Sequence, residues 1–267
     1  LPISKNKTGK KKIVVASILA ALTMTANIVT VEGAIPEGTR TDHLGLAIGT
    51  SSNSKSNQSI AIGYASSAQA PGANPENPAT AVGAGANANG VGAVALGLSA
   101  NATGANAVAL GGGSNGGTNK TEATGTRATA ISFNAKASGS DSIALGNATV
   151  ASDEKAIAIG SDSKATDVGT TALGRSSAAT GASATALGSL ASATGTLATA
   201  VGMQASASGN ESLAIGTTAS ATSGRSLAVG TNSKATGATA VAVGSGSGGS
   251  GPLGFAGSLN STAEIGR

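Results

Sequence analysis

The chain repeatedly alternates small and large side chains over stretches of a few residues. The segments "NAVALG" at 106–111 and "DSIALG" at 141–146 each place two aliphatic residues around an alanine and end on a glycine. Alternation with a period of two is typical of a β-strand that has one face of large residues and one face of small residues. We therefore predict a short strand before each of these glycines.

Fourteen such segments follow one another, and the glycines that end them are usually 14 residues apart. Ser132 stands in place of the glycine in one copy. Two intervals are longer and indicate insertions, near residues 71–78 and near residues 112–127. A fixed short period is the sequence signature of a repeat protein in which each unit stacks on the next.

A second alternation fills the other half of each repeat. Alanine recurs five residues after the glycine between polar neighbours, as at Ala165 and Ala193, which predicts a second strand. Glycine or aspartate recurs seven residues after the glycine, as at Gly181 and Asp167, which predicts left-handed turn residues there. Two strands and two turns make one coil, so the sequence predicts an all-β, parallel β-solenoid of about 14 coils. Its interior is expected to hold alanine, serine and glycine only.

A coil of 14 residues is too flat to enclose large side chains, so the aliphatic residues are expected on the outside of one sheet. Fourteen coils at about 4.8 Å form a stripe on the order of 65 Å long, which exceeds the apolar patch that a soluble monomer tolerates. We therefore expect a homo-oligomer that buries the stripe, and a face-to-face dimer and a three-sided prism both satisfy this argument. The residues expected at the centre of the assembly are Ile48, Ile62, Leu96, Leu110, Leu145, Ile159, Leu173, Leu187 and Ile215.

The composition excludes several classes of protein. The 267 residues include 41 Gly but no Cys and no Trp, so bulky core residues, disulfides and thiolate metal sites are excluded together. Lys and Arg total 16 against 12 Asp and Glu, but five lysines lie within the first twelve residues, and the remaining chain is close to neutral. We therefore expect no nucleic-acid partner.

The N-terminus has the pattern of a targeting segment. Lysines up to Lys12 precede an apolar run at 13–26, and this run is shorter than the ~20 residues of a membrane-spanning helix. We therefore predict an exported protein. The predicted divisions are an export signal and leader at 1–34, a lead-in at 35–44, the roll at 45–250 and a C-terminal tail at 251–267.

Candidate catalytic chemistry is sparse. His43 is the single histidine, so a Ser-His-Asp arrangement would depend on one residue near the N-terminal end of the roll. The segment "GGGSNGG" at 111–117 lacks the Gly-Lys-Ser/Thr ending of a phosphate-binding loop, and the Asp-bearing nonapeptide of calcium-binding β-rolls is absent. We expect no enzyme, no cofactor, no metal and no small-molecule substrate. An ice-binding hydroxyl ladder is disfavoured because Lys164 and Ala178 interrupt the threonine plane.

The segments "NAVALGGGS", "DSIALGNATVAS" and "RSLAVGTNSKATG" resemble the head repeats of YadA-type trimeric autotransporter adhesins, and the resemblance spans about 45–250. It implies a left-handed parallel β-roll that is homotrimeric, with the aliphatic rows facing the threefold axis. It also implies display on the outer membrane of a Gram-negative bacterium and attachment to a host surface glycoprotein or matrix protein. Receptors of the carcinoembryonic-antigen-related cell adhesion family are one candidate. The family continues into a neck, a coiled-coil stalk and a membrane barrel, and we expect the anchor outside these residues.

A binding site is expected where the repeat is interrupted, because the regular positions are already committed to folding. Prolines limit the freedom of the first insertion, glycines dominate the second, and the position after the repeat glycine carries exposed aromatic residues. The candidate receptor-binding residues are Tyr64, Asn74, Glu76, Asn77, Asn119, Lys120, Arg127 and Phe133. A structural spacer of a surface fibre, without a binding site, is the alternative function.

Overall fold

A computed structural model describes residues 39–40, 45–56, 58–70, 78–113, 119–246, 248–249 and 255–257. The chain divides into two units, 1–35 and 36–267, and every described residue belongs to the second unit. The predicted export signal and leader therefore lie outside the described residues. The second unit is all-β, and its described residues form thirty strands.

The strands form two parallel sheets of 15 strands each, and the chain passes from one sheet to the other after every strand. One sheet holds the strands of three residues, here called the long strands: β2 (Leu46–Ile48), β4 (Ile60–Ile62), β6 (Thr80–Val82), β8 (Val94–Leu96), β10 (Val108–Leu110), β12 (Thr129–Ile131), β14 (Ile143–Leu145), β16 (Ile157–Ile159), β18 (Thr171–Leu173), β20 (Thr185–Leu187), β22 (Thr199–Val201), β24 (Leu213–Ile215), β26 (Leu227–Val229), β28 (Val241–Val243) and β30 (Phe255–Gly257).

The other sheet holds the strands of two residues, here called the short strands. These are β1 (Thr39–Arg40), β3 (Asn53–Ser54), β5 (Ser67–Ala68), β7 (Asn87–Ala88), β9 (Asn101–Ala102), β11 (Glu122–Ala123), β13 (Lys136–Ala137), β15 (Val150–Ala151), β17 (Lys164–Ala165), β19 (Ala178–Ala179), β21 (Ser192–Ala193), β23 (Ser206–Ala207), β25 (Ser220–Ala221), β27 (Lys234–Ala235) and β29 (Gly248–Gly249).

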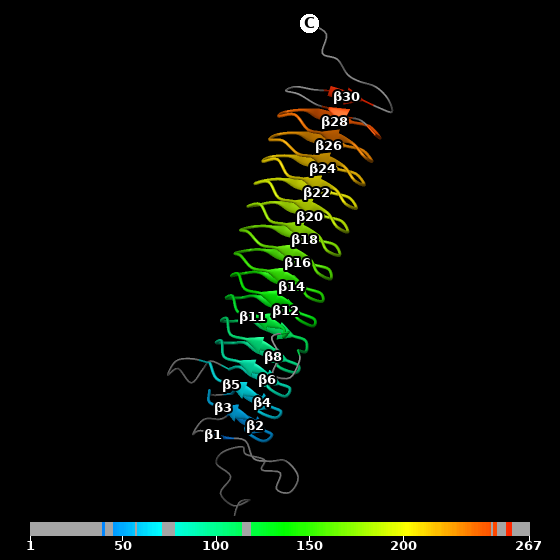
Figure 1. The fold of residues 1–267 in the computed structure, drawn as a ribbon. Helices are drawn as coiled ribbons and strands as arrows, with labels where there is room; N and C mark the ends of the chain where they lie inside the picture. Colours follow the sequence, from blue (N-terminus) through cyan, green and yellow to red (C-terminus); the bar gives the residue numbers. More distant parts are fainter. Residues whose placement is uncertain are drawn as a thin grey trace, which may run out of the picture. The chain divides into compact units, whose positions relative to one another are not determined.

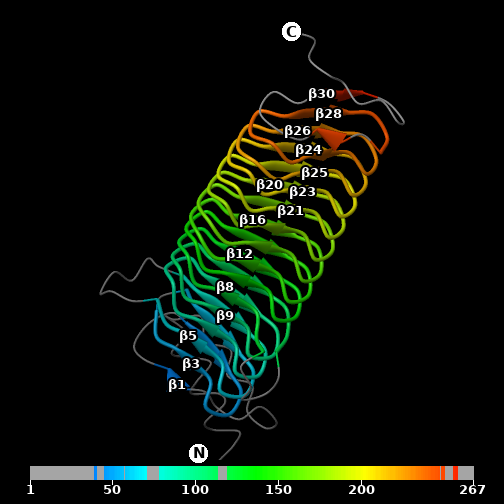
Figure 2. The same ribbon diagram turned by 45° about the horizontal axis from the view of Figure 1, so that its top comes forward.

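Each strand pairs with the equivalent strand of the next coil, so identical repeat positions lie above one another. Ala144 pairs with Ala158 at the centres of β14 and β16, and the same register continues across both insertions, where Ile60 pairs with Thr80 and Val108 with Thr129. The fourteen long strands β2 to β28 are thus joined by thirteen full turns of a solenoid (Figures 1 and 2). The predicted parallel β-solenoid is confirmed.

The interior is built from small side chains, as expected, but threonine also enters it. The central alanines of the long strands from β4 to β28 are fully buried, as at Ala144. Thr149 and Thr170 are fully buried too, so the expectation of alanine, serine and glycine only is wrong. Their hydroxyls donate to turn carbonyls, from Thr149 Oγ1 to Gly146 O at 2.8 Å and from Thr170 Oγ1 to Asp167 O at 2.6 Å. A buried hydroxyl is tolerated because it is hydrogen-bonded.

The turns use glycine for two different physical reasons. The glycine that ends each long strand has a positive φ, such as 130° at Gly146. The glycine seven residues later does not: Gly181 lies outside the left-handed region, and a Cβ there would meet Gly195 O of the next coil at 2.2 Å. The predicted left-handed conformation at this position is therefore wrong. Left-handed residues occur two and nine positions after the strand glycine instead, as at Leu190 and Leu197, each with φ near 60°.

Candidate functional site

The outward residues of the long strands form one continuous apolar surface, which we call the aliphatic face. From β2 to β28, each long strand points its central alanine inward and its first and last residues outward, and these outer residues are half-buried or exposed on the isolated chain. Leu173 and Leu187 are each 40 % exposed. All nine residues expected at the centre of an assembly end long strands on this face, namely Ile48, Ile62, Leu96, Leu110, Leu145, Ile159, Leu173, Leu187 and Ile215.

The turns that follow the long strands form one edge of the roll, here called the first edge. Tyr64, Leu98 and Phe133 occupy the first turn position in alternate coils, and 65 %, 36 % and 43 % of their surfaces are exposed. Backbone hydrogen bonds hold the column together, from Gly85 N to Tyr64 O at 2.8 Å and from Gly113 N to Leu98 O at 2.8 Å. Because successive coils are about 4.8 Å apart, neighbouring members of this apolar row are about 10 Å apart.

The base of the second insertion lies on the same first edge. Residues up to Gly113 leave β10, and β11 resumes the regular register, in which Glu122 pairs with Asn101. The buried Thr121 hydroxyl donates to Ser132 O at 2.7 Å and fastens the returning chain to the next coil. The insertion therefore leaves the roll between the coils of Leu98 and Phe133.

Charged groups continue this surface onto the short-strand sheet. Lys120 and Lys136 both pair with Glu122, with nitrogen–oxygen distances of 3.3 Å and 3.8 Å. Asn119, which precedes them, is exposed. The three charges are partly exposed and in contact with one another, so their contribution to folding stability is small.

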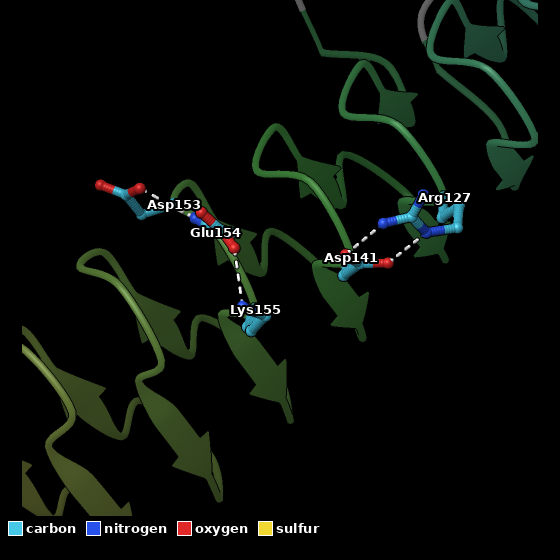
Figure 3. Close-up of polar contacts among 5 residues, drawn as sticks. All are labelled: Arg127, Asp141, Asp153, Glu154 and Lys155. Atoms are coloured by element: carbon cyan, nitrogen blue, oxygen red, sulfur yellow. Dashed lines mark hydrogen bonds and ion pairs between the residues drawn. The ribbon is translucent and has the colours of Figure 1, made fainter.

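Arg127 lies in a different place, in the turn that follows a short strand; these turns form the second edge. Its guanidinium donates two hydrogen bonds to the carboxylate of Asp141 in the next coil, from Nε to Oδ1 at 2.5 Å and from Nη2 to Oδ2 at 2.6 Å (Figure 3). The hydrogen bond from Arg127 lowers the pKa of Asp141, and the same bond raises the pKa of Arg127. Lys155 lies beside Glu154, and their hydrogen bond of 2.7 Å raises the pKa of Lys155.

Asn74, Glu76 and Asn77 lie outside the described residues. The residues that flank them, Ala70 and Pro78, connect β5 to β6 and thus belong to the second edge. The predicted binding residues therefore divide between two edges. Tyr64, Phe133, Asn119 and Lys120 lie on or beside the first edge, and Arg127 lies on the second.

The sequence already places Tyr64, Leu98 and Phe133 at one repeat position, directly after the strand glycine or the serine that replaces it. The pairing of Arg127 with Asp141 was not predicted. The two residues are 14 residues apart, which is one coil, so they occupy equivalent positions of adjacent coils. Comparing charged residues at equivalent positions of adjacent coils would have found this pair.

Other kinds of site find no support in the described part of the chain. No group of three or more His, Cys, Asp or Glu side chains there could hold a metal ion. Across the same residues, no helix has the length and apolar character needed to cross a membrane.

Comparison with known families agrees with this architecture. The family described as YadA head domain repeat (2 copies) matches residues 44–66, 78–100, 88–114, 123–149, 137–163, 151–177, 165–191, 179–205, 193–219 and 221–247. These matches cover well over half of the chain, so the protein belongs to the YadA head family and is the head of a YadA-type trimeric autotransporter adhesin. No curated protein matches the chain closely enough to count as a relative.

Proposed function

We propose that the chain forms a homotrimer on the bacterial outer membrane and binds a host surface glycoprotein or matrix protein. The assembly is supported by the aliphatic face, whose Leu173, Leu187 and Ile215 are 38–40 % exposed on the isolated chain. Full burial of an aliphatic side chain stabilises a protein by about 1.5 to 3 kcal/mol. Two outward aliphatic residues in most coils therefore supply a large driving force for assembly, and membership of a trimeric family favours three copies over two.

The single observation that carries the binding proposal is the apolar row on the first edge. Tyr64, Leu98 and Phe133 lie beside the aliphatic face but not on it, so an assembly that covers the face leaves the row accessible. Isolated exposed apolar residues are ordinary, whereas three in one column with an adjoining insertion are unusual in a chain with so few large side chains. Tyrosine is also among the residues that most often dominate binding energy.

The symmetry of a trimer bears on how such a site would work. Three identical rows would surround the axis, and a partner that is clustered on a host cell would be held by several weak contacts at once. The near-neutral repeat region supports an apolar and hydrogen-bonding contact rather than an electrostatic one. We expect salt to weaken binding only slightly, unlike the steep loss that a polyanion binder shows.

The test is a binding screen of the intact trimer against host glycoproteins, including carcinoembryonic-antigen-related receptors, and matrix proteins. Replacing Tyr64, Leu98 and Phe133 together by alanine should raise the Kd of a partner found in this way by about tenfold or more, since hot-spot residues contribute over 1 kcal/mol each. Met203→Ala is the matched control, because Met203 is 51 % exposed at the same turn position far from the row. Equal affinities for the triple variant and the control would refute this site.

The first insertion is a second, separable contact. Asn74, Glu76 and Asn77 are proposed to contribute from the second edge, and shortening 71–78 by six residues restores the regular spacing without touching Tyr64. A loss of affinity in that variant would place a contact on the second edge. If no host protein binds the intact trimer, the head is a spacer rather than a receptor-binding module.

A further inference from the structure

The aliphatic face carries a pattern of threonines that would matter once the face is covered by other copies. The first residue of each long strand is Leu, Ile or Val in nine of the fourteen strands β2 to β28. In the other five it is threonine, and all five are half-buried. These residues are Thr80, Thr129, Thr171, Thr185 and Thr199. The last three follow one another and form a band of hydroxyls along one side of the face, beside Leu173, Leu187 and Val201.

The hydroxyls of these five threonines have no hydrogen-bond partner among the described residues, in contrast to the buried hydroxyl of Thr149. On the isolated chain, water satisfies them. A covering copy removes that water, and an unpaired hydroxyl then carries the full cost of its desolvation. The last residues of the long strands offer no partner, because they are all Leu, Ile or Val from β2 to β28. Threonines at the same level in the other copies are the obvious partners.

Axial alignment between copies is otherwise weakly determined. The long strands repeat the same backbone from coil to coil, across both insertions, so moving one copy along the axis by one coil keeps thirteen of the fourteen levels in contact. The aliphatic residues discriminate poorly between these alignments, because Leu, Ile and Val pack in similar ways.

The pattern of threonines along the face does distinguish the aligned arrangement of the copies from a shifted one. When one copy is moved by one coil, six of the thirteen remaining levels bring a threonine opposite an aliphatic residue. Thr80 and Thr129 each have an aliphatic residue at the same position of both adjacent coils, so each would face an aliphatic residue in the shifted alignment. The band would do so only at its two ends, where Ile157 precedes Thr171 and Leu213 follows Thr199. Each buried hydroxyl left without a partner disfavours an alignment by on the order of tenfold. The aligned arrangement is the one in which every threonine meets threonine.

We infer that the five threonines of the aliphatic face set the axial register of the assembly by pairing with the same threonines of two further copies of this chain. The inference rests on the proposed trimer. Polar residues at otherwise apolar interface positions set register in coiled coils by the same physics, at some cost in stability.

The absence of cysteine from the whole sequence provides a clean background for a test. One chain carries Leu187→Cys and a second chain, of different mass, carries Val201→Cys, which lies one coil further along the same face. The two chains are refolded together and oxidised, and the dimers are identified by mass. Aligned trimers favour same-position disulfides, and trimers shifted by one coil favour the mixed disulfide.

The test variant changes all five threonines to valine, which preserves their shape and suits a β-strand. We expect a trimer by light scattering, with a severalfold rise in the ratio of mixed to same-position disulfides. The matched control changes five exposed threonines to valine, each of which directly follows a short strand, and should leave the ratio unchanged. These control positions are Thr103, Thr124, Thr180, Thr194 and Thr222.

Each outcome is decisive. A variant trimer that keeps the original ratio would overturn the role of the threonines while leaving the assembly intact. A chain with all five threonines that is monomeric, or whose two cysteine variants form trimers without same-position disulfides, would overturn the proposed packing and the register inference together.

Discussion

The contact of each coil with the next is closest at the glycine seven residues after the strand glycine, and Gly181 shows what a single methyl group would do there. A Cβ on Gly181 would lie 2.2 Å from Gly195 O, 2.4 Å from Gly195 C and 2.7 Å from Thr194 O. Ordinary van der Waals contact begins near 3.4 Å. The carbonyl must therefore retreat by more than an ångström, and it belongs to the backbone of the next coil, so no side-chain rotation can relieve the overlap.

The magnitude follows from the hydrogen bonds at this point, of which two run to the next coil and one closes the turn of Gly181 itself. Thr180 N donates to Ala193 O at 2.9 Å, Gly181 N reaches the same oxygen at 3.5 Å, and Ala184 N donates to Gly181 O at 2.9 Å. Disturbing two or three bonds that contribute about 1 kcal/mol each predicts a loss of about 2 to 3 kcal/mol in the free energy of unfolding for Gly181→Ala. The reduced freedom of the unfolded chain offsets only about 0.5 kcal/mol of this.

A matched control exists in the same kind of turn. Gly224 also lies outside the left-handed region, and the nearest atom to a Cβ there is Asn210 O at 3.8 Å. Gly224→Ala should therefore stabilise the chain by about 0.4 to 1 kcal/mol through the unfolded state. Urea unfolding followed by circular dichroism compares the two variants at one protein concentration. If Gly181→Ala unfolds at the same urea concentration as Gly224→Ala, the close-approach argument fails.

A third variant at the same position tests the mechanism rather than the size of the effect. Asp167 occupies the equivalent position one coil earlier, and its carboxylate accepts a hydrogen bond from Val168 N at 2.7 Å. Aspartate can thus replace lost ladder bonds with a side-chain bond, whereas alanine cannot. We expect Gly181→Asp to unfold at a higher urea concentration than Gly181→Ala, and the reverse order would contradict this account of the turn.

Two further predictions concern assembly and pH. Ile159→Asp places a carboxylate on the aliphatic face and should dissociate or unfold the assembly in light scattering, whereas Thr180→Asp, at an exposed position directly after the short strand β19, should do neither. An intact trimer with Ile159→Asp would refute the proposed packing. Arg127 lowers the pKa of Asp141 in the folded state. The ion pair therefore stabilises the fold at pH values above the pKa of an unfolded aspartate, about 3.9, and this stabilisation is lost as the pH falls through the lower pKa of the folded state. Urea midpoints of the wild type should therefore fall slightly more than those of Asp141→Asn between about pH 6 and about pH 2.5, and parallel curves would show that the exposed pair contributes nothing.

The regular part of the fold could be predicted from the sequence because the repeat separates two classes of side chain with a period of two. Ala144 between Ile143 and Leu145 can face only inward, since a flat coil has room for a methyl group but not for an aliphatic side chain. The same alternation recurs in fourteen copies, so an atypical residue at one position does not alter the prediction for the other copies. Strand positions, their inward and outward faces and the exposure of the aliphatic rows all followed from this pattern.

The tertiary structure alone decided how the coils touch one another. Gly181 is required by a carbonyl of the next coil and not by its own φ, and no property of a single coil distinguishes these two reasons. Thr170 enters the interior because a turn carbonyl lies within reach of its hydroxyl. Tyr64 and the flanks of 71–78 belong to opposite edges, although they are close in sequence, because a strand of the other sheet separates them. Local alternation sets which way a side chain points, whereas stacking sets what that side chain meets.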